Sequence, residues 1–149
     1  MEQAYYELTH LIERLHRRYL DVLRTDLERL AIGDINAVQA LLLRNIGAEE
    51  INVRALMDRG YYLGSNASYN LKRLVECGYL EQQRSQHDRR STIIRASKKG
   101  RDLCERIAEA ADRQAAALFE GNGNTEIEAA CATMRRLETV WDSHVSKRV

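Results

Sequence analysis

Residues 65–73 hold a dense run of side chains that can donate and accept hydrogen bonds. The run supplies hydroxyl, amide, phenol and cationic groups, at Ser65, Asn66, Ser68, Tyr69, Asn70, Lys72 and Arg73. Amide and guanidinium groups match the donors and acceptors that base edges display in the major groove of DNA. The first carboxylate after this run is Glu76, so the stretch is suited to a polyanionic partner.

A second group of chemically active residues is cationic and lies between positions 84 and 101. Its members are Arg84, Arg89, Arg90, Arg95, Lys98, Lys99 and Arg101. Between Arg84 and Arg101 the only acid is Asp88, although the whole chain balances 23 Lys and Arg against 22 Asp and Glu. Arginines at the tip of a hairpin can enter a minor groove, and flanking lysines such as Lys99 can neutralise phosphates.

Other chemistry has little support in the sequence. The histidines His10, His16, His87 and His144 lack the short spacing of a metal site, and no Cys-x-x-Cys is present, so we expect no metal and no cofactor. Three widely spaced cysteines, Cys77, Cys104 and Cys131, favour reduced thiols over disulfides. Cys77 is more simply a packing residue than a redox sensor. Without a nucleophile beside a base, paired acids or a phosphate-binding glycine loop, the chain is not expected to be an enzyme.

The elements that position these residues are mostly helical. Apolar residues from Leu8 to Leu30 recur every three or four positions, which predicts a long first helix ending near Ile32, with Gly33 as its left-handed closing residue. Asn36 and Gln39 have the spacing of a capping box for a short helix over about 37–45, stopped by Gly47. Asn52 is placed to cap a second short helix, which ends at Gly60.

A fourth helix is predicted from about Asn66 to Cys77, with Ser65 as its N-cap and Gly78 as its closing residue. An apolar stripe lies on one side of it, and the polar run of residues 65–73 on the other. Residues 79–84 and 91–96 then predict two strands joined by a charged turn.

The remaining chain predicts two further helices. Ser97 can cap a fifth helix that continues to Leu118, and the sequence GNGN at 121–124 separates it from a sixth helix carrying Ile127, Trp141 and Val145. The expected fold class is mainly α with a small β-hairpin wing: a winged helix-turn-helix with N- and C-terminal dimerisation helices. No secretory signal or apolar run of about 20 residues is present, which predicts a cytoplasmic protein with no membrane partner.

The segment from Leu71 to Gly100 resembles the signature of the MarR family of bacterial transcription regulators. The matching motifs are Asp88-Arg89-Arg90 in the wing and Ser97-Lys98-Lys99-Gly100 at the start of the next helix. The resemblance extends over essentially the whole chain. It implies a single domain over 1–149, in which 1–32 and 98–149 form dimerisation helices and 34–97 form the winged helix-turn-helix lobe.

This resemblance also implies a function and roles for particular residues. Family members are homodimers that bind pseudo-palindromic operators on double-stranded DNA, often as repressors released by a small-molecule effector or by cysteine oxidation. By the motif, Asp88 braces the wing through an ion pair, Arg90 enters the minor groove and Arg89 contacts the backbone. No cysteine lies in the first helix, where peroxide-sensing members carry theirs, so that route is not expected here.

Alternatives remain at the sequence level. The polar face of the fourth helix could be ordinary solvated surface, and the winged helix could bind protein rather than DNA as a helical interaction module. Aromatic and histidine residues of the terminal helices, with His16 and Tyr19 foremost, could line an effector pocket, although packing in the core or the dimer interface is favoured for them.

Overall fold

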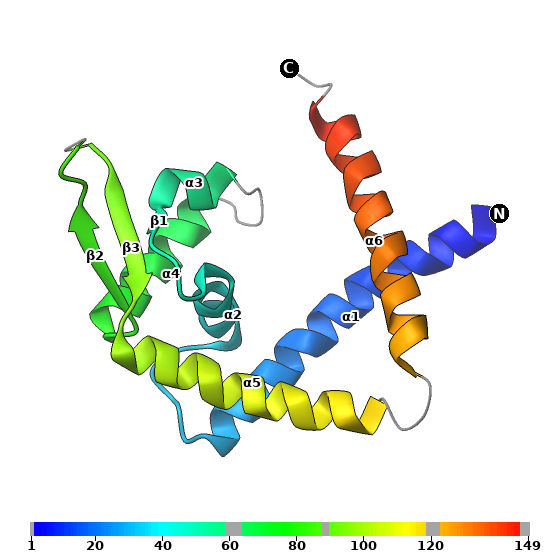
Figure 1. Cartoon of the computed structure of the whole chain (residues 1–149), viewed down its shortest axis with the longest axis horizontal. Coiled ribbons are helices and arrows are strands. Elements are labelled where there is room, and N and C mark those ends of the chain that lie inside the picture. The colour runs from blue at the N-terminus through cyan, green and yellow to red at the C-terminus, as the bar shows by residue number, and fades with distance from the viewer. Residues whose placement is uncertain (1, 59–63, 88–89, 119–122, 147–149) are drawn as a thin grey trace. The chain divides into compact units, whose positions relative to one another are not determined.

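The computed structural model describes residues 2–58, 64–87, 90–118 and 123–146. Its contacts form two compact units, Met1–Glu109 and Ala110–Val149. The first unit contains every strand among the described residues and most of the helices (Figure 1). The second contains the end of α5 and all of α6.

The long first helix, α1, spans Glu2–Arg29. Its closing residue is Ala31, with φ 56°, rather than the expected Gly33. The N–H of Ile32 donates to the carbonyl of Leu27 at 2.9 Å, and the N–H of Ala31 to that of Glu28 at 3.0 Å, which is the Schellman pattern. The expectation for Gly33 was wrong because it placed the end of the helix two residues too late.

Three helices follow, and local capping explains most of their ends. Helix α2 spans Ala37–Ile46, and the predicted capping box between Asn36 and Gln39 is confirmed. Helix α3 spans Val53–Asp58, and the Asn52 side chain accepts from the N–H of Arg54 at 2.8 Å, as an N-cap does. Helix α4 spans Gly64–Glu76, so Ser65 lies inside the helix and the N-cap predicted there is wrong.

Gly78 closes α4 as predicted. It has φ 79°, and the N–H of Tyr79 donates to the carbonyl of Leu74 at 2.9 Å. The buried side of α4 is formed by Ala67, Leu71 and Leu74, as the apolar stripe predicted. Burying this stripe turns the polar side of α4 outward.

The sheet has three antiparallel strands in the order β1-β3-β2. The hairpin strands β2, Leu80–Arg84, and β3, Thr92–Ala96, pair from Leu80 with Ala96 to Arg84 with Thr92. The third strand, β1 at Ile51–Asn52, was not predicted, because two residues are too short to show an alternating pattern. It places Ile51 opposite Ile94 and joins the segment before α3 to the middle of β3.

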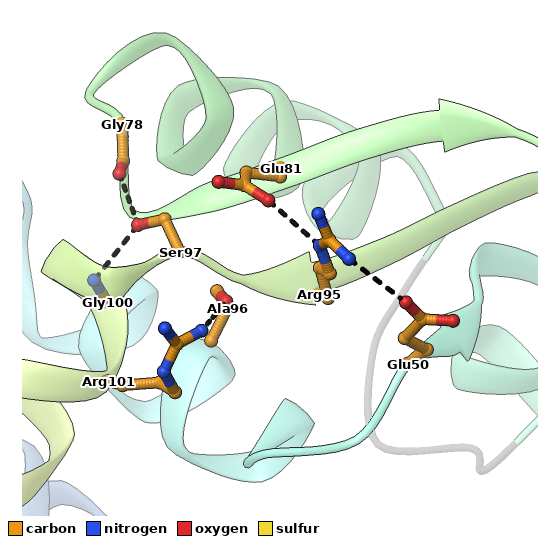
Figure 2. A network of polar contacts seen from close by, with 8 residues as sticks. All are labelled: Glu50, Gly78, Glu81, Arg95, Ala96, Ser97, Gly100 and Arg101. Atoms are coloured by element: carbon orange, nitrogen blue, oxygen red, sulfur yellow. Dashed lines mark hydrogen bonds and ion pairs between the residues drawn. The ribbon is translucent and has the colours of Figure 1, made fainter.

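Helix α5, Lys98–Leu118, begins directly after β3. The Ser97 hydroxyl accepts from the N–H of Gly100 at 3.1 Å and donates to the carbonyl of Gly78 at 2.6 Å, which confirms Ser97 as the helix cap (Figure 2). A Cβ on Gly100 would lie 2.1 Å from the carbonyl oxygen of Tyr79. The glycine at this motif position is therefore required by the close approach of two backbones.

The core of the first unit draws on α1, α2, α4, the sheet and α5. Its most enclosed large side chains include Leu23, Leu43, Leu74, Tyr79 and Ile107. In the second unit, α6 spans Gly123–Ser146 and is mostly exposed. The fold class predicted from the sequence, mainly α with a β-hairpin wing, is confirmed. Among the described residues, none of the helices is both long and apolar enough to cross a membrane.

Candidate nucleic-acid interface

The outward side of α4 carries the polar residues that the sequence singled out. Asn66, Ser68, Lys72 and Arg73 are exposed, and Tyr69 is 67% exposed although it is a large aromatic residue. Lys72 and Arg73 lie 3.9 and 3.8 Å from the Glu76 carboxylate, so both cations have a weak, exposed ion pair near the end of the helix. The predicted residues Asn66, Ser68, Tyr69, Lys72 and Arg73 therefore share one helix and one exposed face.

Asn70 differs from its neighbours because it is half-buried and bonded to another helix. Its side-chain oxygen accepts from the Nε2 of Gln39 at 3.2 Å. Gln39 is 4% exposed and belongs to the capping box of α2, where its Oε1 accepts from the N–H of Asn36 at 3.0 Å. A continuous hydrogen-bonded path thus joins the start of α2 to the middle of α4.

The wing supplies the second group of predicted residues. Arg84 is exposed at the end of β2, and Arg90 is exposed just before β3. Asp88 and Arg89 lie outside the described residues, so their bracing and backbone roles stay predictions. Beyond the ladder, the N–H of Ser85 donates to the carbonyl of Ser91 at 2.9 Å, which extends the pairing toward the turn.

A polar hollow of about 570 Å³ lies between the turn end of β3 and the start of α3. Residues from both elements line it, including Arg54, Arg90 and Thr92. Asn52 joins the two sides, since its Nδ2 donates to the Ser91 hydroxyl at 2.5 Å. Arg54 was not singled out from the sequence and Asn52 was predicted only as a helix cap, because only the pairing of β1 with β3 brings them to the wing.

Arg95 has a different setting from the other wing arginines (Figure 2). Its Nε donates to Glu81 at 2.8 Å, and its NH1 donates to Glu50 at 3.3 Å. The hydrogen bond that Arg95 donates to Glu81, together with the charges of the Glu81 and Glu50 carboxylates, raises the pKa of Arg95 above its ordinary value. Arg95 therefore bridges β2 to the segment before β1, and its charge is matched within the protein.

Lys99 lies in a cluster with Asp34, Cys77 and Tyr79, here called the Lys99 cluster. Its ammonium donates to Asp34 at 3.2 Å and to the Cys77 carbonyl at 2.8 Å, and lies 4.1 Å from the centre of the Tyr79 ring. The Tyr79 hydroxyl donates to the other Asp34 oxygen at 2.8 Å. The structure thus gives Lys99 internal partners, and its contact with phosphate stays a prediction.

The carboxylate of Asp34 is stabilised in its charged form. Burial opposes this, but hydrogen bonds from Tyr79 and Lys99 outweigh it and hold the pKa of Asp34 below its ordinary 3.8. Burial and the adjacent Asp34 raise the pKa of the Tyr79 hydroxyl, which remains a donor. The Lys99 cluster is therefore an ionic link between the α1–α2 connection, the end of α4 and α5.

The effector candidates His16 and Tyr19 both lie on α1 and are exposed. The Tyr19 hydroxyl accepts a short hydrogen bond from Arg44 of α2. A hollow of about 230 Å³ lies beyond Arg44, lined also by Ala48, Arg101 and Cys104 but by neither candidate. Burial raises the pKa of the Cys104 thiol, which disfavours the reactive thiolate.

Comparison with known proteins places this arrangement among familiar folds. Residues 35–100 match a family model described as a winged helix DNA-binding domain. The transcriptional activator ExpG of exopolysaccharide II synthesis, from Rhizobium meliloti (strain 1021), is 44% identical over 139 residues. That match covers 93% of this chain and 72% of that protein.

Solved structures with the same fold share less sequence. Streptococcus pneumoniae FabT in complex with DNA has a TM-score of 0.75 and 18% identity, over 93% of this chain and 98% of that chain. A MarR transcriptional regulator from Methanosarcina mazei Go1 has a TM-score of 0.75 and 22% identity, over 90% and 97%. A mutant MarR from E. coli complexed with operator DNA has a TM-score of 0.71 and 21% identity, over 88% and 93%.

Proposed function

This chain belongs to the MarR family of winged helix transcription regulators, and on that premise we propose that it binds double-stranded DNA with α4 in the major groove and the β2–β3 wing at the adjacent minor groove. The observation that carries this proposal is the exposed polar face of α4, held in one compact unit with the arginine-bearing wing. A helix of this kind fits the major groove, and Arg90 at the wing would contact the minor groove. The protein acts in this proposal as a regulator in the cytoplasm and performs no catalysis.

Two wing arginines provide a matched test. Arg90→Ala is expected to lower affinity for DNA about tenfold, in line with the loss of a specific contact of 1–3 kcal/mol. Arg95→Ala serves as the control, because Glu50 and Glu81 already bind that guanidinium within the protein. Affinities would be measured by gel shift on duplexes selected by the wild-type protein from a random library. Equal losses for the two variants would contradict the wing assignment.

The active form in this proposal is a homodimer. The first and last helices both carry exposed apolar side chains: Tyr6 is 62% and Leu15 57% exposed on α1, and Val140 is 61% and Val145 69% exposed on α6. Contiguous exposed apolar residues typically mark protein interfaces. A twofold dimer would present two α4 helices to half-sites about 10 base pairs apart, one turn of B-form DNA.

The direction of regulation has two candidates. Repression is the behaviour that the sequence motifs favour, since many relatives in this family repress. Activation is favoured by the relative that is 44% identical, which is an activator by name. Transcription in vitro from a promoter next to the selected site distinguishes them: a repressor lowers transcript yield as protein is added, and an activator raises it.

We further propose that a small anionic effector binds in the hollow beside Arg44. Arg44 and Arg101 supply two guanidinium groups there against the single carboxylate of Glu105, and Tyr19 orients Arg44 by accepting its hydrogen bond. Tyr19→Phe should therefore weaken release from DNA by aromatic carboxylates such as salicylate, used as a probe, without changing DNA affinity in their absence. His16→Ala is the control on the same helix, because His16 does not line this hollow.

A further inference from the structure

A hydrogen bond between the side chains of Gln39 and Asn70 joins α2 to α4, and it has a defined polarity. An asparagine amide has an acceptor end and a donor end, and the two can be exchanged by a rotation of 180°. Which end faces outward decides whether Asn70 can bind an acceptor or a donor. The neighbours of Gln39 settle that choice.

The capping box fixes the orientation of the Gln39 amide first. Its Oε1 is held by the N–H of Asn36, so its Nε2 must be the end that faces Asn70. Asn70 therefore turns its oxygen toward Gln39 and its NH2 group away. Gln39 is 4% exposed, so it cannot itself contact DNA.

The NH2 group of Asn70 is available for an external partner. Within the described ranges, this NH2 group has no hydrogen-bond partner in the protein. Every buried side-chain nitrogen and oxygen in those ranges does have a partner, so the NH2 group is not a buried one. The nitrogen therefore reaches solvent, on the helix that carries Tyr69 and Arg73. Its two N–H bonds suit the oxygen and nitrogen acceptors of DNA.

We propose that Gln39 is a positioning residue for DNA recognition: it locks the Asn70 amide so that its NH2 group donates to an acceptor on the duplex. This inference rests on the proposed function and adds a residue outside the DNA-facing surface. The acceptor is either a base edge or a phosphate oxygen, which share this chemistry. The start of α2 thereby controls the hydrogen-bonding character of one position on α4.

A single conservative substitution inverts this arrangement. In Gln39→Glu, one carboxylate oxygen still accepts from the N–H of Asn36, and glutamate at this third helical position favours the capping box and the helix dipole. The other oxygen now faces Asn70, which must rotate to donate to it. Asn70 then presents its oxygen to DNA, although no DNA-facing residue has been changed.

The expected result is a loss of affinity of at least tenfold for Gln39→Glu in the full-length protein, with a lower melting temperature because the new carboxylate is buried. Gln39→Met is the control: it removes the lock but leaves Asn70 free to rotate and donate. We expect it to melt at a lower temperature, yet to bind within about threefold of the wild type. Asn70→Asp keeps the bond from Gln39 and should reproduce the loss seen with Gln39→Glu.

The probes are duplexes selected by the wild-type protein and their single-base variants. A changed preference at one base pair, shared by Gln39→Glu and Asn70→Asp, assigns the acceptor to a base edge. An equal loss on every sequence in these two variants, with Gln39→Met near wild type, assigns the acceptor to a phosphate.

Wild-type binding by Gln39→Glu overturns the proposal, and so does a loss with Gln39→Met as large as with Gln39→Glu. If Gln39→Glu fails to fold, Asn70→Asp decides alone, with wild-type binding overturning the proposal. Failure of the wild-type protein to select any duplex would instead contradict the proposed function.

Discussion

At the scale of single residues, the Lys99 cluster shows how a cation in a basic segment can serve the fold. The ammonium of Lys99 neutralises Asp34, contacts a carbonyl at the end of α4 and lies over an aromatic ring. Both charged side chains are partly exposed, at 52% and 41%, so solvent screens the pair. Its contribution to stability is correspondingly modest.

We expect Lys99→Met to destabilise the protein by about 0.5 kcal/mol at neutral pH. Because the folded pKa of Asp34 lies below its ordinary 3.8, the ion pair stabilises fully above that value and is lost as the pH falls through the folded pKa. The difference between variant and wild type should therefore shrink below about pH 4. Urea unfolding at a series of pH values measures this, and a constant difference down to pH 2 would contradict it.

Gly100 offers a second prediction at this scale. Gly100→Ala places a methyl group against the Tyr79 carbonyl and should destabilise the protein by about 1–3 kcal/mol, as overpacking does. Gly33→Ala is the matched control, because a Cβ there has open space within 4 Å and the backbone is not left-handed. Gly33→Ala should be neutral or should stabilise the protein by about 0.5 kcal/mol, because alanine has less conformational freedom than glycine in the unfolded chain. Thermal unfolding compares the two directly.

At the scale of elements, the sequence predicted the helix ends that depend on residues close together in the chain. The capping box at Asn36 and the closing glycine Gly78 depend on residues three or four positions apart, so their patterns are visible in the chain. The end of α1 was misjudged because Ala31 adopts a left-handed conformation that glycine more commonly occupies. Strand β1 exists only through its pairing with β3.

For the same reason, the sequence could not reveal side-chain partners that are distant in the chain. Asn70 was predicted as a DNA contact from its type and position, but Gln39 is 31 residues away and had been interpreted only as a cap. Arg95 was grouped with the wing cations, whereas Glu50, 45 residues earlier, binds it in the folded protein. Only the packing of α2 on α4 and of β1 on β3 reveals these pairs.

Ala31 allows a prediction at the level of a helix end. A left-handed residue with a Cβ costs about 1 kcal/mol relative to glycine, which is partly offset by glycine's greater freedom in the unfolded chain. Ala31→Gly should thus raise the free energy of unfolding by a few tenths of a kcal/mol. Its denaturation midpoint in urea, compared with that of Ala48→Gly at an exposed turn of ordinary φ, would measure this.

At the scale of the whole molecule, the proposal requires a second copy of the chain. Trp141→Glu places a charge on the apolar stripe of α6 and should yield a monomer with little affinity for DNA, because only a dimer spans two half-sites. Ser143→Glu puts the same charge on the other side of the helix and should remain dimeric. Light scattering coupled to gel filtration gives the mass of each, and a dimeric Trp141→Glu would contradict the assignment of α6.

The bare contact at Gly100 has a mechanical consequence. No side chain separates Gly100 of α5 from the backbone of Tyr79, the residue before β2, so a tilt of the helix would be passed to the hairpin. A strand of five residues reaches about 16 Å from that contact. A tilt of roughly 5° at α5 would then carry the far end of the strand sideways by about 1.4 Å, about half the length of a hydrogen bond.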